Sequence, residues 1–384
     1  MRFRIPKFSS IVYRTREFFR NEAQRRNHKR KQAVIKNWLL KLSSKKVWVG
    51  ANFAPINGIG NHIHAIQKYS TLKIGLFPED KVMAQMSPYH FTSILKEDFN
   101  KFEPSSDVIL HSHVYPWYIH WCAKQQEKGI KWIHTYHAHY FDEYAENGLN
   151  DWQKEFNQVF IHTASKADVK ISVSKWQQNY YEKNHGIQTL YVPNGIDVSL
   201  CDAAEGGNFK KELGVDSYIL NVSRHDIVKN PGEFLRLAEI MPAHQFVIIG
   251  PGLSKDVFQT EYDLDVPINV IIYGSASHSK VQDAIAGCDV LISNSKREGL
   301  PTLVLEGMAH SKPVVVSNEP GSIEAIDHGN YGYYYELGDI QDLKNKTIKA
   351  LKDEEIGHKA RKRVLEEYDW RVVSKKLDNI YNGN

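Results

Sequence analysis

Residues 289–309 read DVLISNSKREGLPTLVLEGMA, a short apolar run followed by a turn and an apolar stretch of helical length. Residues 289–293 predict a buried strand. Pro301 suits the first position of a helix, where its missing N–H is not needed. Gly299 permits a close approach of the backbone to a ligand or to another segment. The stretch therefore predicts a strand, a tight turn and a helix in sequence.

The same alternation of short runs and helical stretches occurs twice along the chain. The first series is VWVGAN from Val47, DVILH from Asp107, KWIHTY from Lys131, DVKISV from Asp168 and TLYVP from Thr189. The second is YILNVS from Tyr218, FVIIG from Phe246, NVIIY from Asn269, DVLIS from Asp289 and KPVVVS from Lys312. Alternating strands and helices indicate parallel sheets with helices on both faces.

We therefore expect an α/β chain of two doubly wound, Rossmann-like domains that face each other across a cleft. The looser segment DAAEGGN, residues 202–208, predicts a junction near residues 196–208. The expected parts are a basic helical extension at 1–46, a first domain at 47–200 and a second domain at 201–368. In such sheets ligands bind at the carboxyl ends of the strands, so motifs directly after strands carry the most weight.

The composition is that of an ordinary globular protein, with 42% hydrophobic and 24% charged residues among 384. No apolar run approaches the roughly 18 residues of a membrane span. The start lacks the apolar core of a secretory signal. Cys122, Cys201 and Cys288 are few and scattered, which argues against a disulfide framework or a thiolate zinc site and predicts a cytoplasmic location.

Residues 1–46 carry 15 Lys and Arg residues against Glu17 and Glu22. Two helical stretches are expected there, on the apolar residues Ile11, Phe18 and Phe19 and on the stripe of Ile35, Trp38, Leu39 and Leu42. The favoured interpretation is contact with an anionic membrane surface. A packing or oligomer-forming helix is the alternative, and nucleic acid is least favoured because no nucleic-acid module is visible.

Two loops after strands carry residues suited to anions. Gly58 and Gly60 follow the first strand and lead into a helix, which predicts either a phosphate or sugar site or only a tight turn. Arg224 and Lys229 follow the first strand of the second half. The planar guanidinium of Arg224 and the compact ammonium of Lys229 together suit a diphosphate. The alternative is an ordinary surface loop.

Histidines gather after two strands. His111 and His113 share one face of an extended segment, and so do His137 and His139. Metal ligation with Asp142 or Glu143, hydrogen-bonded core histidines and polar contacts to a hydroxylated substrate all stay open. The last of these is favoured for His137.

Glu298 and Glu306 bracket the turn and the helix start. Carboxylates bind sugar and ribose hydroxyls well, because each can accept two hydrogen bonds from a diol. Backbone N–H groups between Leu300 and Leu303 could hold phosphate oxygens. In the alternative, Glu298 only caps the helix and Glu306 is solvated.

Taken together, these residues resemble the family-4 retaining glycosyltransferases of the GT-B fold. The pair Glu298 and Glu306, with Gly-Leu-Pro between them, is the most specific part of the resemblance. VPNGID at 192–197 resembles the family's interdomain segment. The resemblance covers about residues 47–384 and implies that a last helix, at 369–384, crosses back to the first domain. Ser223 and Thr302 stand where the family usually has glycine.

The resemblance implies the site residues and their roles. Arg224 and Lys229 would neutralise the donor diphosphate, Glu298 would hold hydroxyls of the transferred sugar, and Glu306 would hold the ribose. His137 would lie near the anomeric carbon. The residues implied to bind the donor also include Gly58, Gly60, Gly299, Leu300, Pro301 and Thr302.

The implied reaction transfers a sugar, with retention, from a nucleoside diphosphate sugar, expected to be a UDP sugar, to an acceptor hydroxyl, and it needs no metal or other cofactor. The basic extension at 1–46 predicts a glycan or lipid-linked acceptor of the bacterial cell surface and a peripheral location on the inner face of the cell membrane. A homo-oligomer is a further option. A nucleotide-sugar epimerase of the same fold and a catalytically silent sugar-binding scaffold are the alternatives.

Overall fold

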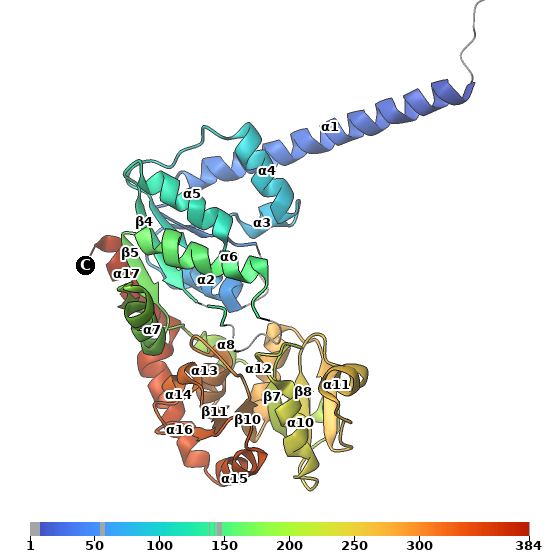
Figure 1. Cartoon of the computed structure of the whole chain (residues 1–384), viewed down its shortest axis with the longest axis vertical. Helices are drawn as coiled ribbons and strands as arrows, with labels where there is room; N and C mark the ends of the chain where they lie inside the picture. Colours follow the sequence, from blue (N-terminus) through green and yellow to red (C-terminus); the bar gives the residue numbers. More distant parts are fainter. Residues whose placement is uncertain (1–7, 54–57, 138, 142, 144–147, 384) are drawn as a thin grey trace, which may run out of the picture.

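The computed structural model describes residues 8–53, 58–137, 139–141, 143 and 148–383, with side chains from residue 22 onward. Within this part, the chain forms two six-stranded sheets in two domains that lie one above the other (Figure 1). Every strand pairing in them is parallel. The predicted α/β fold of two doubly wound domains is confirmed.

The first sheet has the strand order β2-β1-β3-β4-β5-β6. Its strands are β1 (Val47–Gly50), β2 (Ile74–Phe77), β3 (Ile109–Ser112), β4 (Lys131–Tyr136), β5 (Val169–Ser172) and β6 (Leu190–Tyr191). The helices of this half are α1 (Phe8–Leu42), α2 (Gly58–Tyr69), α3 (Asp80–Met83), α4 (Pro88–Asp98), α5 (Pro116–Gln126), α6 (Asp151–Gln158), η2 (Val159–Thr163), η3 (Ala164–Lys166), α7 (Lys175–His185) and α8 (Val198–Asp202). The sequence analysis missed β2, whose four residues include a glycine.

The second sheet has the strand order β12-β11-β10-β7-β8-β9. Its strands are β7 (Ile219–Val222), β8 (Phe246–Ile249), β9 (Val270–Gly274), β10 (Val290–Ser293), β11 (Val314–Ser317) and β12 (Tyr333–Tyr335), of which β12 was not predicted. The helices that follow α8 are α9 (Gly206–Leu213), α10 (Pro231–Glu239), α11 (Lys255–Tyr262), α12 (His278–Gly287), α13 (Thr302–Ala309), α14 (Pro320–Ala325), α15 (Ile340–Ala350), α16 (Glu354–Arg363), η4 (Val364–Tyr368) and α17 (Trp370–Asn382).

The direction of chain progression reverses between β1 and β3 in the first sheet, and between β7 and β10 in the second. Such reversals open a crevice at the carboxyl ends of the two strands, where ligands of doubly wound sheets bind. The loops after β1, β3, β7 and β10 therefore border the two crevices, and these loops carry most of the predicted site residues.

Each sheet is covered on both faces, which explains why the strands are continuous apolar runs instead of alternating ones. Val47 and Val49 pack with α2 and α17 on one face of the first sheet, while Trp48 packs on the other. In the second sheet, Leu220 faces α12 and α13, and Ile219 faces α10 and α15. The three cysteines are free and buried.

The segment predicted as loose, 202–208, is partly helical, because α9 begins at Gly206. A β carbon on Gly206 would lie 2.4 Å from the backbone nitrogen of Gly287 at the end of α12. Glycine at this position therefore lets α9 pack closely against α12.

The amino-terminal extension forms one helix instead of two. Its α1 spans 35 residues and projects from the first domain (Figure 1). The stripe interpreted as membrane-facing is buried in the first domain, where Trp38 is 2% exposed and packs edge-on against Phe77. The Trp38 indole N–H donates to the Leu76 carbonyl at 3.2 Å. For these residues the packing interpretation is correct. No helix of the described residues is long and apolar enough to cross a membrane.

The last helix, α17, lies against the first domain although it follows the second in sequence (Figure 1). Val373, Leu377 and Tyr381 join the apolar cluster that covers β1 and β3. Asp378 accepts hydrogen bonds from the Ser70 and Thr71 side chains at 2.5 and 2.7 Å. The helix thus completes a sheet that begins more than 300 residues earlier in the chain.

The packing of α1 predicts the effect of shortening the Trp38 side chain. Trp38→Ala should lower the free energy of unfolding by about 3–5 kcal/mol, since it removes a buried aromatic side chain and leaves a cavity. Urea unfolding followed by circular dichroism measures this change. Leu40→Ala is the matched control, because Leu40 lies on the same turn but is 65% exposed and should change stability by less than about 0.5 kcal/mol. Equal effects of the two changes would contradict the packing of α1.

Candidate active site in the interdomain cleft

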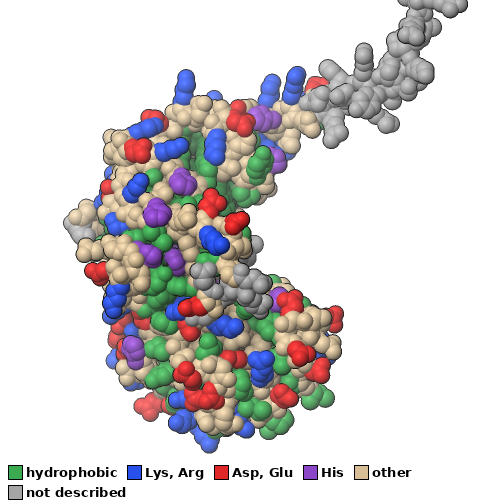
Figure 2. Space-filling view, in the orientation of Figure 1, with side chains coloured by type: hydrophobic (Ala, Val, Ile, Leu, Met, Phe, Trp, Pro, Cys, Tyr) green, Lys and Arg blue, Asp and Glu red, His purple; other side chains and the backbone are tan. Residues whose placement is uncertain are grey.

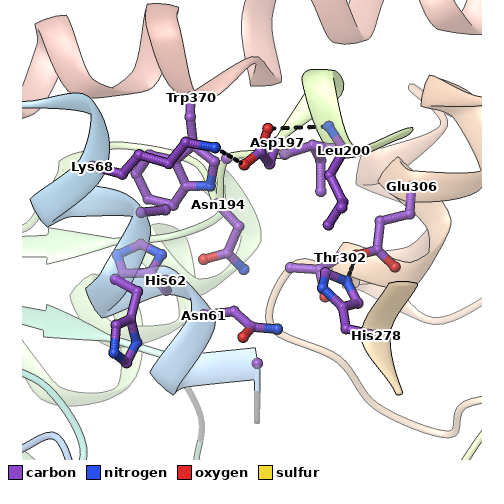
Figure 3. A pocket seen from close by; sticks show the side chains of 15 residues that line it. Asn61, His62, Lys68, Asn194, Asp197, Leu200, His278, Thr302, Glu306 and Trp370 are labelled. Atoms are coloured by element: carbon purple, nitrogen blue, oxygen red, sulfur yellow. Dashed lines mark hydrogen bonds and ion pairs between the residues drawn. The ribbon is translucent and has the colours of Figure 1, made fainter. Parts of the chain in front are cut away.

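The surface is hollowed between the two domains (Figure 2), and the predicted residues divide between two cavities there. The larger cavity, of about 830 Å³, is lined by His137, Arg224, Lys229, Glu298 and Gly299 among others. The smaller one, of about 400 Å³, is lined by Gly58, Thr302 and Glu306 among others (Figure 3). Three further predicted residues are buried and line neither cavity, namely Gly60, Leu300 and Pro301.

An ion pair joins the loops after β7 and β10 at the reversal point of the second sheet. The Lys229 ammonium donates to a Glu298 carboxylate oxygen at 2.5 Å. Both side chains are largely shielded, with exposed fractions of 28% and 17%. The pair presents a hydrogen-bond donor and an acceptor side by side on the wall of the larger cavity, which suits a hydroxylated and anionic ligand.

Arg224 lines the same cavity but does not converge with Lys229 on one point. Its guanidinium donates to Asp226 Oδ2 at 2.9 Å through Nε and at 2.6 Å through Nη2, and its side chain is 62% exposed. Burial alone would raise the pKa of Asp226, but the Val228 N–H and the Arg224 guanidinium outweigh burial and lower it. Each of the two expected cations, Arg224 and Lys229, thus pairs with a carboxylate of its own domain in this structure.

Gly299 brings the two domains into backbone contact. A β carbon at this position would lie 2.5 Å from the carbonyl oxygen of His137 and 3.0 Å from Gln177 Nε2. The Trp176 indole N–H donates to the Gly299 carbonyl at 2.6 Å, and the Asn194 amide donates to the Leu300 carbonyl at 3.0 Å. The turn that carries Glu298 is therefore fixed by residues of the first domain.

Helix α13 begins one residue later than predicted, with Pro301 as its N-cap residue and Thr302 as its first residue. The Thr302 and Leu303 N–H groups have no hydrogen-bond partner among the described residues. Glu306 lies about one turn further and its side chain is only 15% exposed. Because Glu298 pairs with Lys229 and Glu306 is shielded, the alternative of a helix cap and a solvated carboxylate is wrong.

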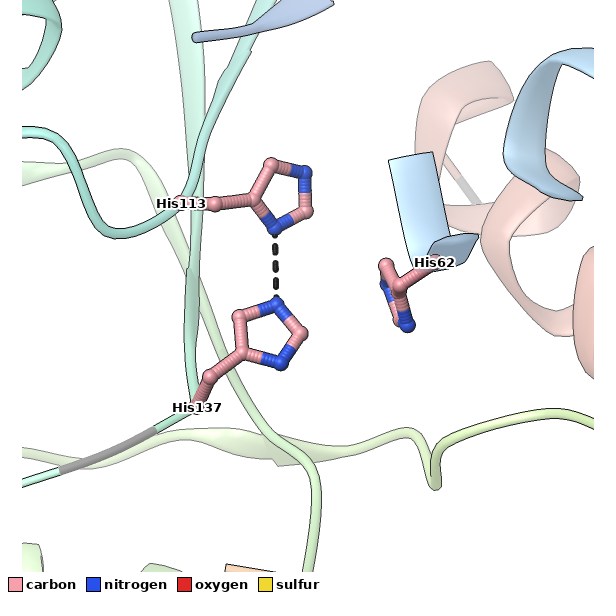
Figure 4. Close-up of side chains that lie close together, drawn as sticks. All are labelled: His62, His113 and His137. Atoms are coloured by element: carbon pink, nitrogen blue, oxygen red, sulfur yellow. Dashed lines mark hydrogen bonds between the residues drawn. The ribbon is translucent and has the colours of Figure 1, made fainter. Parts of the chain in front are cut away.

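The histidines separate into different environments. His111 bonds Tyr381 Oη at 2.7 Å and Thr135 Oγ1 at 2.8 Å, so it is a hydrogen-bonded core histidine. His113 Nδ1 and His137 Nε2 lie 2.9 Å apart, and His62 of α2 completes a cluster with them (Figure 4). Burial lowers the pKa of His137 to about 4, so its ring is neutral at physiological pH.

The other residues considered with the histidines lie elsewhere. His139 packs against the rings of Phe141 and Tyr180. Asp142 lies outside the described residues. Glu143 accepts from Arg297 at 2.6 Å, so it is an interdomain ion-pair partner. The sequence analysis missed His62 because the residue stands within a helix, away from both histidine pairs.

Residues 208–367 match the model of the family described as Glycosyl transferases group 1, and residues 78–200 match that of Glycosyltransferase Family 4. One match lies in each domain, and the two together cover more than half of the chain. The chain belongs to the family-4 glycosyltransferases of the GT-B type.

Several curated proteins are similar to parts of this glycosyltransferase chain. N-acetyl-alpha-D-glucosaminyl L-malate synthase of Bacillus anthracis is 27% identical over 59% of this chain and 62% of its own length. The capsular polysaccharide biosynthesis glycosyltransferase CapM of Staphylococcus aureus is 31% identical over 24% of this chain and 26% of its own length. The UDP-Gal:alpha-D-GlcNAc-diphosphoundecaprenol alpha-1,3-galactosyltransferase of Escherichia coli is 26% identical over 42% and 45%. This chain thus spans less than two thirds of the length of these relatives.

Solved structures share the fold. The Anabaena protein HepE in complex with UDP-glucose superposes with a TM-score of 0.70 and 16% identity, over 88% of this chain and 99% of that one. Sucrose-phosphate synthase from Thermosynechococcus elongatus gives a TM-score of 0.69 at 16% identity, over 88% and 98%. At this identity they show that the glycosyltransferase chain shares their fold.

Within the smaller cavity, Glu306 has a partner that the sequence analysis missed. His278, the first residue of α12, places Nε2 2.9 Å from Glu306 Oε1 (Figure 3). Gln282, one turn further, places its amide nitrogen 3.2 Å from the same ring. The hydrogen bond to Glu306 raises the pKa of His278, although burial acts in the opposite direction. Its place directly after β9 is the signal that could have identified His278.

This pair predicts a measurable titration. The pKa of His278, followed by NMR of its ring protons, should lie above the ordinary value of 6.5. Because the folded-state pKa is raised, the pair stabilises the fold fully below about pH 6.5, and this contribution is lost as the pH rises through the folded-state pKa. Glu306→Gln should lower the titration midpoint, since the effect of burial is then opposed only by the smaller effect of the Asp197 charge.

The control for this titration is Glu355→Gln, because Glu355 is an exposed carboxylate on α16. It should leave the midpoint of His278 unchanged. A His278 midpoint that does not respond to Glu306→Gln would contradict the hydrogen-bonded pair.

Proposed function

We propose that the protein is a retaining glycosyltransferase, which moves a sugar from a nucleoside diphosphate sugar, UDP-linked, to a hydroxyl of a glycan or lipid-linked acceptor in bacterial cell-surface polysaccharide synthesis. The observation that carries this proposal is the Lys229–Glu298 pair on the wall of the larger cavity, at the reversal point of the second sheet. Arg224 lines the same cavity, and so does His137 of the first domain.

The roles assigned to these residues follow from the charges that develop on the sugar and on the leaving group during transfer. As the bond between the anomeric carbon and the diphosphate breaks, positive charge grows on the sugar and negative charge on the leaving group. Lys229, Arg224 and the free N–H groups at the start of α13 stabilise the leaving diphosphate. Arg224 turns from Asp226 to do so. Its exposed side chain allows this movement.

The acceptor oxygen bonds to the anomeric carbon on the face from which the diphosphate leaves, so that the configuration is retained. The acceptor proton passes to an oxygen of the leaving phosphate. Glu298 holds sugar hydroxyls and Glu306 holds the ribose, and the two cavities together take the donor. Since side chains and backbone supply the positive charge, the proposed reaction needs no metal or other cofactor.

The relatives support the choice of donor and acceptor. The Escherichia coli relative is named for a UDP sugar donor and a diphosphoundecaprenol-linked acceptor. The Staphylococcus aureus relative is named for capsular polysaccharide biosynthesis. A protein of the same fold has been solved with UDP-glucose. Each of these statements describes the relative.

Removing either member of the ion pair should abolish most transfer. With a nucleotide sugar chosen from a panel by thermal stabilisation, Lys229→Ala and Glu298→Ala should each lower kcat/KM for UDP release by roughly 10²–10³-fold. The matched control is Lys349→Ala, because Lys349 is exposed on α15 and should leave the rate unchanged.

Three outcomes would count against the proposal. Full activity in folded Glu298→Ala would remove Glu298 from the site. Conversion of one nucleotide sugar into another without an acceptor would identify an epimerase. Binding of the donor without any turnover, over a panel of acceptors, would identify a silent scaffold.

We also propose that the enzyme works at the cytoplasmic face of the membrane through α1. The exposed part of this helix carries Arg25, Arg26, Lys29 and Arg30, before the buried stripe begins at Ile35. The exposed basic side chains suit anionic lipid headgroups, and the buried stripe anchors the helix to the first domain. The membrane contact assigned to 1–46 is thus confined to the part before residue 35.

Charge removal on α1 should weaken vesicle binding. The double change of Lys29 and Arg30 to Ala should reduce co-sedimentation with phosphatidylglycerol vesicles by roughly 30-fold in affinity, since each basic residue near the surface contributes about 1 kcal/mol. The control pair is Lys349 and Lys352, which are exposed in the second domain. Equal binding to neutral phosphatidylcholine vesicles would contradict the proposal.

A further inference from the structure

We propose that His62, His113 and His137 form a binding site for a borderline divalent transition ion of the Zn²⁺ class, and that the bound ion inhibits sugar transfer. The inhibition rests on the proposed function, whereas the ion site does not.

The three side chains come from three elements of the first domain. His62 lies on α2, His113 directly follows β3, and His137 directly follows β4 (Figure 4). Among the described residues, one ring nitrogen of each lies within 4.8 Å of the other two. Tetrahedral zinc–imidazole sites place nitrogens about 3.4 Å apart, given bonds of about 2.0–2.1 Å. Because His113 Nδ1 and His137 Nε2 lie 2.9 Å apart, a bound ion would separate these two rings slightly and draw the His62 ring closer.

The hydrogen bonding of these rings is incomplete. His113 Nε2 has no hydrogen-bond partner in the described part of the chain, and the ring nitrogens of His62 have none with good geometry, although the Asn194 amide lies near enough to act on the His62 ring. His62 is 7% exposed and His113 is 1% exposed. Buried polar atoms almost always have partners, so incompletely bonded rings that lie this close together indicate a site for an ion or a water molecule.

The protonation state also suits a cation. Burial, with smaller effects of the neighbouring histidines, lowers the pKa of both His62 and His113 well below the ordinary value. Burial lowers the pKa of His137 to about 4. All three rings are therefore neutral near pH 7, and their lone pairs are available without competition from protons.

The donor set selects the kind of ion. Three imidazoles suit Zn²⁺, Cu²⁺ or Ni²⁺, whereas Mg²⁺ and Ca²⁺ prefer oxygen ligands. Glu143 is held by Arg297, and the group includes no described carboxylate. The fourth position stays open to water, because His62 borders the smaller cavity and His137 the larger one.

A bound ion would change the site in two ways. It would take the place of the proton between His113 Nδ1 and His137 Nε2, and the ring that now donates this proton would carry it on its other nitrogen instead. It would also place two positive charges beside the carbon on which positive charge develops during transfer. Both effects oppose the reaction, the second by direct repulsion.

Ion binding is tested on the full chain without any sugar. Titration with Co²⁺ should give the intense visible absorption of a tetrahedral complex at one equivalent, and Zn²⁺ should displace it. X-ray absorption of the wild-type zinc complex should show nitrogen ligands at about 2.0–2.1 Å. Octahedral cobalt, or no binding at micromolar concentrations of the ion, overturns the proposed site. Both results come from the wild-type protein and need no variant.

Variants then assign the ligands. His62→Asn and His113→Asn should each weaken Zn²⁺ binding by at least 10-fold, since even the loss of a ligand's supporting group costs roughly 10–100-fold. His120→Asn is the control, because His120 is exposed on α5 and should bind as the wild type does. Circular dichroism establishes that the variants fold. Unchanged affinity in both buried variants places the ion elsewhere and overturns the proposal.

Inhibition is measured separately with the active donor and acceptor. Transfer in EDTA should be full, and one equivalent of Zn²⁺ should lower it at least 10-fold in the wild type. Zinc bound at the three histidines without loss of transfer overturns the inhibitory role and leaves the site standing. Absence of transfer in EDTA contradicts the proposed function but not the ion site.

Discussion

At Gly299 the backbones of the two domains touch, since a β carbon there would lie 2.5 Å from the carbonyl oxygen of His137. This contact fixes the turn that carries Glu298 against the strand end that carries His137. Trp176 reinforces it from the first domain by donating to the Gly299 carbonyl. A larger residue at 299 would meet the His137 carbonyl and disrupt this contact between the domains.

The charged groups of the second domain are arranged in neutral pairs around this contact. Lys229 is held by Glu298, Arg224 by Asp226 and Glu306 by His278. Such pairing keeps shielded charges compensated when no ligand is present. A ligand that carries both phosphates and hydroxyls can offer anionic acceptors to the cations and hydroxyl donors to the carboxylates of these pairs.

The sequence predicted the fold well because most strands are apolar runs separated by helices of regular length. It missed β2 and β12, which have four and three residues and depend on their neighbours for pairing. It grouped Arg224, Lys229 and Glu298 correctly into one cavity, because all three follow strands that meet at the reversal point. It could not find His62 or His278, since each becomes part of the site only when α2 and α12 pack. It also assigned Trp38 to a membrane-facing stripe, because an apolar stripe looks the same whether a protein or a lipid covers it.

The position of α17 has a consequence for the order in which the chain becomes structured during synthesis. Domains generally fold as units, amino-terminal first, as the ribosome releases them. Here the apolar face formed by Val47, Val49 and Ile109 is completed by Val373, Leu377 and Tyr381, which are translated after the whole second sheet. Part of the core of the first domain therefore stays uncovered until the second domain has been synthesised. A premature stop just before residue 370 would spare the whole second sheet and still leave the first domain unfinished.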